Sequence, residues 1–144
     1  MTIEIINKND REKALMLVLS VFIQYEAPDY SEQGIQTFKD FIHNKESIDM
    51  LEFYGAYKDN EIAGVIATRN NGNHIALFFV DGKYHRQGIG RKLFETVTQK
   101  STGEKITVNS SPYAVEVYKK LGFVPDSDEQ IAEGMRFIPM TYIK

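Results

Sequence analysis

Two glycines, Gly88 and Gly90, stand where an apolar strand pattern gives way to a helical one. The run from Phe78 to Val80 is apolar, and apolar residues recur at helical spacing after Gly88. The N–H groups at a helix N-terminus favour an anion, and glycine lets phosphate oxygens approach the backbone closely. Arg86 and Arg91 add positive charge beside the glycines. The spacing therefore predicts an anion-binding loop suited to a pyrophosphate.

Two common phosphate-binding motifs do not fit this loop. No Gly-Lys-Ser/Thr follows at the spacing of a Walker loop, and Leu93 stands where a dinucleotide fingerprint has its third glycine. A purely structural interpretation stays open, in which Gly88 and Gly90 permit a tight turn and the basic residues form a solvated helix face.

A second segment of interest begins after a short apolar strand, Ile106–Val108. Asn109 follows this strand, and Ser111 with Pro112 is typical of a helix start. Tyr118 falls within that helix. A tyrosine at helical spacing with core residues ordinarily belongs to the core, and an asparagine after a strand is an ordinary turn residue. The residues alone leave the structural and the chemical interpretation of both side chains open.

The two segments, in this order, resemble the GNAT superfamily of acyl-CoA-dependent N-acetyltransferases, whose phosphate loop reads Arg/Gln-x-x-Gly-x-Gly/Ala. The window from His85 to Gly90 matches this loop, with His85 where the family usually has Arg or Gln. The segment from Val108 to Phe123 is similar to the family's second cofactor motif. The resemblance implies acetyl-CoA (coenzyme A) as the acyl donor. The cofactor-binding residues that it implies are Phe78, Phe79, Val80, His85, Arg86, Gln87, Gly88, Ile89, Gly90, Arg91, Asn109 and Tyr118.

The resemblance also implies roles for particular residues. Backbone groups of the run from Phe78 to Val80 would pair with the pantetheine amides, as an added strand does at a sheet edge. Asn109 would contact the pantetheine arm or hold a water molecule near it, and Tyr118 would protonate the departing thiolate. The chain has no cysteine, the commonest alternative nucleophile. The expected reaction is direct attack on acetyl-CoA, in a ternary complex, by a primary amine of a small molecule or protein.

A base must remove a proton from the attacking amine. We predict Glu26 for this role, with Asp29 and Glu32 as alternatives. All three lie at the corner between the first two helices, which in the resembled fold borders the acceptor site. His74 is a fourth candidate, because a neutral imidazole is available near pH 7. The acidic corner hints at a cationic acceptor, such as a polyamine or a lysine side chain.

Two other functions are compatible with the same residues. A non-catalytic acyl-CoA-binding sensor or interaction module would keep the phosphate loop and have a closed acceptor pocket. A structural or partner-binding domain would match the loop by chance and have no cofactor affinity. Tyr118 favours an enzyme over the non-catalytic binder.

The helices and strands that would position these residues are expected to form one α+β domain over residues 1–144. The resemblance implies a mixed, mostly antiparallel central sheet flanked by helices. The apolar run of the strand 74–80 suggests a central place for it. Residues 27–30 form a corner after the first helix, which Pro28 stops, and residues 43–47 a polar loop. The pattern predicts strands at 3–5, 53–57, 62–68, 74–80, 106–108 and 135–143, and helices that begin near residues 10, 31, 88 and 111.

The composition and charge of the chain limit the classes of partner that it is expected to bind. The 17 basic and 20 acidic residues are spread along the chain and give a net charge of −3, so no broad basic face for nucleic acid is expected. The longest apolar stretch, from Ala14 to Ile23, is too short to span a bilayer, so no membrane partner is expected. The three histidines are scattered, and no metal site is predicted. The absence of cysteine suits the cytoplasm. A homodimer that pairs through residues 136–142 is a further possibility.

Overall fold

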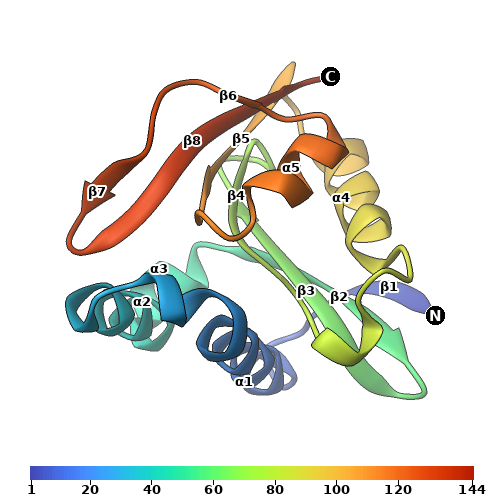
Figure 1. Cartoon of the computed structure of the whole chain (residues 1–144). Helices are drawn as coiled ribbons and strands as arrows, with labels where there is room; N and C mark the ends of the chain where they lie inside the picture. Colours follow the sequence, from blue (N-terminus) through green and yellow to red (C-terminus); the bar gives the residue numbers. More distant parts are fainter.

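The computed structural model describes residues 1–144, and its strands form one sheet with helices packed on both faces (Figure 1). The strands are β1 (Thr2–Ile5), β2 (Glu52–Lys58), β3 (Glu61–Arg69), β4 (His74–Val80), β5 (Lys105–Ser110), β6 (Val124–Pro125), β7 (Gln130–Ala132) and β8 (Met135–Ile143). The α-helices are α1 (Arg11–Val21), α2 (Glu32–His43), α3 (Lys45–Asp49), α4 (Ile89–Lys100) and α5 (Val115–Leu121). Short π or 3-10 turns are η1 (Phe22–Glu26), η2 (Ala27–Asp29) and η3 (Gly82–Tyr84).

The sheet is mixed. Its strands follow the order β1-β2-β3-β4-β5-β8-β6, and β7 pairs with β8 beside this path. Every pairing is antiparallel except that of β4 with β5. The prediction of a mixed, mostly antiparallel sheet is confirmed, and β4 has the central place expected for it. The turn at Asp59 and Asn60, with φ of 53° and 65°, is the tight two-residue link that the sequence indicated between β2 and β3.

Each face of the sheet has its own core. The helices α1 and α2 pack on one face through a cluster that contains Phe22 and Phe79. The helices α4 and α5 pack on the other face through a cluster that contains Leu93 and Tyr118. Because side chains alternate along a strand, β4 sends Leu77 and Phe79 to the first cluster and Phe78 and Val80 to the second. The strand β4 therefore reaches both layers of the protein.

The parallel strands β4 and β5 pair only at their beginnings. His74 pairs with Thr107 and Ile75 with Val108, and no further register is formed between the two strands. Both strands continue beyond this point, β4 to Val80 and β5 to Ser110. The two central strands therefore diverge, and the edge of β4 that faces β5 lacks a strand partner over most of its length.

The end of the first helix differs from the simple helix that the sequence predicted up to Pro28. The α-helix ends at Val21 and continues as a π-helix, in which the N–H of Ala27 donates to the carbonyl of Phe22. A 3-10 turn with Pro28 in its first turn follows. A hydrophobic pattern of this length does not distinguish i→i+4 from i→i+5 bonding, so the change escaped sequence analysis. This change matters for the position of one side chain, because the π turn sets the direction in which Glu26 projects.

The predicted polar loop at 43–47 is wrong. The chain forms the short helix α3 there, and the side chain of Asn44 caps it by accepting a hydrogen bond from the Ser47 N–H, with an N···O distance of 3.1 Å. Ile48 is buried against the core and holds this helix in place. None of the helices has the length and apolar character needed to cross a bilayer.

The hairpin formed by β7 and β8 lies against the start of α2 (Figure 1). Thr37 Oγ1 donates to the Glu133 carbonyl at 2.6 Å, across the two elements. Gly34 and Gly134 meet backbone to backbone, and a methyl group on Gly34 would overlap the Gly134 carbonyl. The sequence predicted β8 with its observed bounds, but not this contact.

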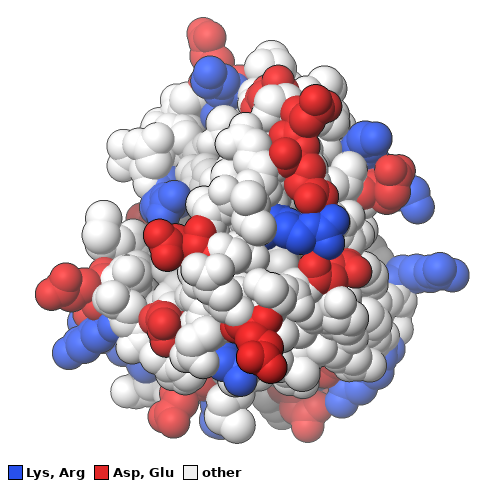
Figure 2. Space-filling view, turned by 60° about the vertical axis from the view of Figure 1, so that its left-hand side comes forward, with Lys and Arg blue, Asp and Glu red and all other residues white.

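Both edges of β8 are occupied within the chain. It pairs with β5 along one edge and with β6 and β7 along the other. Each of residues 136–142 already has a strand partner within the chain on at least one edge, and a homodimer that pairs through them stays a prediction. On the face that Figure 2 presents, acidic and basic side chains are interspersed.

Candidate active site

The glycine loop delivers free backbone N–H groups at the start of α4. Helix α4 begins at Ile89, and the N–H of Lys92 makes the first intrahelical bond, to the Gly88 carbonyl at 3.1 Å. The N–H groups of Ile89, Gly90 and Arg91 consequently have no carbonyl within the helix to bond. No acidic side chain stands in the first turn, so the positive end of the helix dipole is not neutralised. The loop has the donors and the field that an anion requires.

The two glycines have different reasons to be glycine. Gly88 has a φ of +79°, a left-handed conformation that side chains disfavour. Gly90 has no such φ, and a Cβ there would meet only Phe78 and Val80 at ordinary contact distances of 3.5 Å or more. The tight-turn interpretation thus accounts for Gly88 and leaves Gly90 unexplained. A side chain at Gly90 would reduce the space in front of the N-terminus of α4.

His85, the departure from the resembled loop, fastens the loop to the end of β4. Its Nε2 lies 2.8 Å from the carbonyl oxygen of Val80, and because a carbonyl can only accept, Nε2 carries the proton. The imidazole ring also packs against the Tyr25 ring, with centroids 5.0 Å apart. His85 therefore has a structural role in this fold as the residue that positions the loop.

The open edge of β4 presents backbone groups to the interior. The Asp81 N–H donates to the Ala63 carbonyl at 2.8 Å, which makes this pair a hydrogen-bonded pair of the β3–β4 ladder. In an antiparallel ladder bonded and non-bonded pairs alternate, so the backbone groups of Phe78 and Val80 point away from β3 and toward β5. Since β5 does not pair there, the amides of Phe78 and Val80 and the carbonyl of Phe78 are available to an extended ligand.

The loop and this strand edge line a cavity of about 390 Å³, here called the loop cavity. Gln87, Arg91 and Asn109 are the predicted cofactor residues that do not line it. Gln87 accepts a hydrogen bond from Lys58 Nζ at 3.0 Å, and Arg91 donates to the Lys120 carbonyl at 3.2 Å. The predicted residues that do line it are Phe78, Phe79, Val80, His85, Arg86, Gly88, Ile89, Gly90 and Tyr118.

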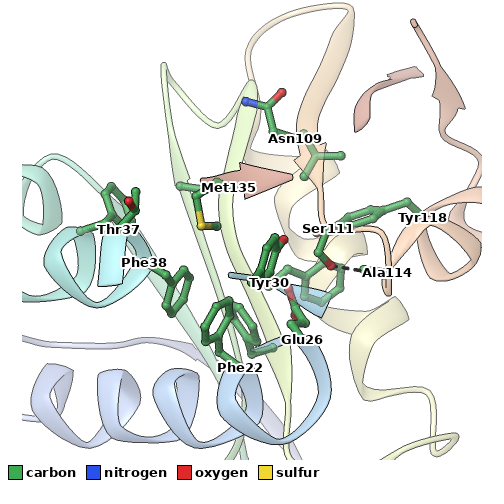
Figure 3. Close-up of a pocket in the computed structure, with 15 residues that line it drawn as sticks. Phe22, Glu26, Tyr30, Thr37, Phe38, Asn109, Ser111, Ala114, Tyr118 and Met135 are labelled. Carbon is green, nitrogen blue, oxygen red and sulfur yellow. Dashed lines mark hydrogen bonds between the residues drawn. The ribbon is translucent and has the colours of Figure 1, made fainter. Parts of the chain in front are cut away.

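A second cavity, of about 270 Å³, lies beside the corner formed by η1, η2 and α2, and is here called the corner cavity (Figure 3). Asn109 lines this cavity, from the end of β5. The two cavities share part of their walls, so they meet inside the protein. The shared residues are Glu26, Phe78, Phe79, Ala114 and Tyr118.

Glu26 is the carboxylate at this junction. It projects from the π turn and is half-buried. Burial raises the pKa of Glu26 to about 7, the Ser111 side chain acts against this rise, and the charge of Asp29 adds to it. A carboxyl group with a pKa near 7 exchanges a proton readily at neutral pH, which is the property of a general base.

The other three candidates for the base lie elsewhere. Asp29 and Glu32 are exposed, and neither lines either cavity. His74 stands at the opposite end of β4 from the glycine loop, with its Nδ1 2.8 Å from Thr107 Oγ1. Burial, aided by the charge of Arg69, lowers the pKa of His74 to about 4. The fold therefore brings Glu26 alone of the four to the junction.

Tyr118 reaches the junction from α5, on the other side of the sheet from α1. Its ring packs edge-on against Phe78 with centroids 5.9 Å apart, and it is buried in the second core cluster. Burial, and to a lesser extent the charge of Glu26, raises the pKa of the Tyr118 hydroxyl well above its ordinary value. The hydroxyl stays protonated at neutral pH and is suited to donate a proton rather than to accept one. Tyr118 is therefore a core residue that also lines both cavities at their junction.

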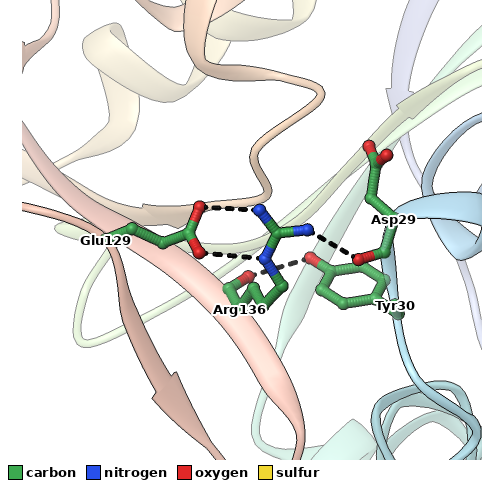
Figure 4. A network of polar contacts seen from close by, with 4 residues as sticks. All are labelled: Asp29, Tyr30, Glu129 and Arg136. Atoms are coloured by element: carbon green, nitrogen blue, oxygen red, sulfur yellow. Dashed lines mark hydrogen bonds and ion pairs between the residues drawn. The ribbon is translucent and has the colours of Figure 1, made fainter.

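A polar network fixes the β7–β8 hairpin beside the corner cavity (Figure 4). Arg136 forms a two-pronged ion pair with Glu129, with N···O distances of 2.9 and 3.0 Å, and also donates to the Asp29 carbonyl at 2.8 Å. In return the Tyr30 hydroxyl donates to the Arg136 carbonyl at 3.0 Å. Because Tyr30 and Met135 both line the corner cavity, this network holds two of its walls together.

Sequence reasoning missed most of the apolar wall of the corner cavity. Most of its members come from the helical corner and from the hairpin, and the apolar ones carry the same periodic pattern as core residues, so no signal in the sequence separates them from the core. The missed residues are Phe22, Tyr30, Thr37, Phe38, Phe41, Ala76, Val108, Ser111, Ala114 and Met135.

Comparison with known proteins identifies the family. A family model described as an acetyltransferase (GNAT) domain matches residues 26–144. The chain therefore belongs to the GNAT acetyltransferase family, as its two motifs indicated. A search of curated proteins finds no significant match.

Solved structures show the same fold at low sequence identity. A GCN5-related N-acetyltransferase from Rhodopseudomonas palustris, also described as a class-II aminotransferase, has a TM-score of 0.85 at 17% identity, over 99% of this chain and 95% of that one. The PaiA N-acetyltransferase from Thermoplasma acidophilum, in complex with coenzyme A, has a TM-score of 0.70 at 22% identity over 100% of both chains. An aminoglycoside 6'-N-acetyltransferase complexed with coenzyme A has a TM-score of 0.62 at 13% identity, over 99% of this chain and 97% of that one.

Proposed function

We propose that this protein transfers the acetyl group of acetyl-CoA to a primary amine, by direct attack in a ternary complex. The observation that carries the proposal is the junction of two cavities at Glu26 and Tyr118. One cavity leads to a loop with free helix N–H groups, and the other offers a separate place for a second substrate. A reaction between two bound molecules needs this arrangement.

The loop cavity is the proposed cofactor site. The pyrophosphate would accept hydrogen bonds from the N–H groups of Ile89 and Gly90, at the positive end of α4. The pantetheine arm would lie along the open edge of β4, bonded to the backbone of Phe78 and Val80. This course would bring the thioester to the junction, beside Tyr118. The coenzyme A complexes of the Thermoplasma acidophilum protein and of the aminoglycoside 6'-N-acetyltransferase support the choice of ligand.

The corner cavity is the proposed acceptor site. An amine enters mostly as an ammonium ion, and the Glu26 carboxylate accepts one of its protons. The apolar walls assist, because burial lowers the pKa of an ammonium group. The neutral nitrogen then attacks the carbonyl carbon of the thioester, and a carbon–nitrogen bond forms.

Collapse of the tetrahedral intermediate completes the transfer. The carbon–sulfur bond breaks, the electron pair leaves on sulfur, and Tyr118 donates its proton to the coenzyme A thiolate. The new amide nitrogen loses its surplus proton, which restores the phenol, and Glu26 returns its proton to water. Holding amine and thioester together contributes up to roughly 7 to 11 kcal/mol. Proton donation by Tyr118 contributes about 10² to 10⁴ in rate.

A non-catalytic acyl-CoA binder remains the rival function. The corner cavity argues against it, because a binder has no use for a second pocket that joins the first beside a carboxylate of raised pKa. The proposal includes a cytoplasmic location, for which the lack of cysteine is the support.

Thermal unfolding with acetyl-CoA, followed by thiol release in the presence of a mixture of primary amines, tests the proposal. At a hundredfold excess over its dissociation constant, acetyl-CoA should add roughly 2.7 kcal/mol of stability, or about 5 to 10 °C in Tm. Gly90→Glu is the control variant, because its side chain would fill the phosphate site and its carboxylate would repel the phosphates. Stabilisation without thiol release from any amine would identify a binder, and no stabilisation of the wild type would overturn cofactor binding.

A further inference from the structure

The corner cavity has the walls of a site for an apolar molecule. Aromatic rings from the helical corner form one side, with Phe22 and Phe38 stacked at a centroid distance of 3.9 Å. Phe41 and Met135 extend this side, and Ala76 and Val108 belong to the strands opposite. In total 11 of its 15 lining residues are hydrophobic. A hydrated, many-hydroxyl acceptor would lose its water contacts there without replacement.

Only one carboxylate faces this cavity. Glu26 lines it, whereas Asp29 and Glu32, the other acids of the corner, are exposed and do not. A polyamine that entered would bring a second ammonium group into apolar surroundings with no opposite charge. The expectation of a polyamine acceptor, which rested on an acidic corner, is therefore not supported by where those acids lie.

The β7–β8 hairpin covers the cavity on the side of α2. Thr37 bonds to the Glu133 carbonyl, the backbones of Gly34 and Gly134 are in contact, and Tyr30 bonds to the Arg136 carbonyl. A polypeptide laid between α2 and the hairpin would have to break all three contacts. The cover therefore favours a small molecule over a lysine side chain of a protein.

The size of the cavity indicates the size of the acceptor that fits it. Its volume of about 270 Å³ corresponds to roughly nine water molecules at about 30 Å³ each. A single aromatic ring with a two-carbon amine arm has about as many non-hydrogen atoms, so it would fill the cavity and place its one nitrogen at Glu26.

We propose that the acceptor is a small primary monoamine on an aromatic or compact apolar body, of the arylalkylamine class. The inference rests on the proposed acetyl transfer and narrows it. The ring lies among Phe38, Phe41 and Met135, and the ammonium group is bound by Glu26 at the junction with the cofactor cavity.

The test is a comparison of kcat/KM for thiol release from acetyl-CoA with four acceptors: 2-phenylethylamine, ethanolamine, spermidine and a lysine-containing peptide. Burial of one aromatic ring should favour 2-phenylethylamine over ethanolamine by roughly ten- to a hundredfold. The preference for 2-phenylethylamine over spermidine and the peptide should be at least as large. Higher kcat/KM for ethanolamine, spermidine or the peptide would overturn the inference while leaving acetyl transfer intact.

Two variants of Phe41 test where the aromatic ring of the acceptor binds. Phe41→Ala removes a ring from the wall and should raise KM for 2-phenylethylamine by roughly tenfold, with KM for acetyl-CoA unchanged. Tyr142→Ala is the matched control, because Tyr142 is also a partly buried aromatic residue but packs on Phe94 and Phe123 and lines neither cavity. Phe41→Leu keeps most of the bulk and guards against misfolding; its KM should lie between those of the wild type and Phe41→Ala. An equal effect of the Phe41 and Tyr142 variants on KM would contradict the proposed ring position.

If acetyl-CoA stabilises the protein but none of the four amines releases thiol, acetyl transfer itself fails, and the acceptor inference falls with it. That result is distinct from a preference for the wrong amine.

Discussion

Glu26 and Tyr118 line the same two cavities, although one projects from a π turn at the end of α1 and the other from α5. Burial raises the pKa of both, but with opposite consequences: Glu26 can accept a proton near pH 7, whereas Tyr118 keeps its own. Two groups whose roles as base and acid are separated in this way suit a reaction that moves one proton from the amine and another to the thiolate.

Tyr118→Phe should lower kcat by roughly 10² to 10⁴ and leave acetyl-CoA affinity nearly unchanged, because only the hydroxyl that protonates the thiolate is lost. The ring contact with Phe78 survives in this variant. Steady-state kinetics together with a thermal shift by acetyl-CoA would measure the two effects separately. An unaltered kcat would remove Tyr118 from the mechanism.

The pH profile of kcat/KM should report Glu26. Because its pKa is about 7 and the base acts when ionised, activity should fall below pH 7 with the slope of a single ionisation. In Glu26→Gln this inflection should disappear and turnover should drop by roughly 10² to 10⁴. The same inflection in the variant would assign it to another group.

Glu26 should also leave a signature in stability. Its pKa is raised in the folded state from 4.5 to about 7, so the folded protein binds the proton more tightly than the unfolded chain. The resulting stability is fully present below pH 4.5 and is lost as pH rises to about 7. Glu26→Gln should therefore be more stable than the wild type at pH 8, by up to about 3 kcal/mol, and similar to it near pH 4. Denaturant unfolding at the two pH values measures this difference.

Substitutions at the two loop glycines should separate folding from binding. Gly88→Ala must adopt a φ of +79° and should lose about 1 kcal/mol of stability. Gly90→Glu meets no strained φ and lies within the helix, so stability should stay close to that of the wild type, while the carboxylate repels the phosphates and weakens acetyl-CoA binding. Unfolding in the absence of ligand and titration with acetyl-CoA provide the two readouts. Wild-type affinity in Gly90→Glu would favour a purely structural loop.

Loosening the hairpin should affect the acceptor and not the cofactor. Glu129→Gln weakens the ion pair with Arg136 at a distance from both cavities. We expect KM for the amine to rise roughly two- to fivefold, the size of the coupling in an exposed ion pair, with KM for acetyl-CoA unchanged. Initial rates measured with each substrate varied in turn would reveal the contrast. A change in both constants would point to a general loss of structure.

Local patterns sufficed for much of the fold. The bounds of β8 and the turn at Asp59 and Asn60 depend on the alternation of side chains and on the backbone conformations that Asp and Asn tolerate, and neighbouring residues alone carry both signals. The helix α3 also had a local signal, since Asn44 is a good cap, but its single turn is too short for a hydrophobic pattern to appear.

The residues of the site were harder to predict from the sequence than the fold was. Glu26, Asp29 and Glu32 stand within two helical turns, and nothing in their spacing tells which of them is buried. The π turn decides it, because it directs Glu26 inward and leaves the other two in solvent. The apolar wall of the corner cavity was hidden for another reason: residues such as Phe38 obey the same periodicity whether they border a cavity or fill a core.

The divergence of β4 and β5 gives the protein two internal reporters. The amide hydrogens of Phe78 and Val80 point into the gap and have no strand partner, so in the free protein they should exchange with solvent faster than their neighbours in the ladder. A bound pantetheine arm would cover them and slow the exchange. Two backbone amides thus record occupancy of the site without a label, and they do so for any ligand that completes the strand edge, whether or not it carries an acetyl group.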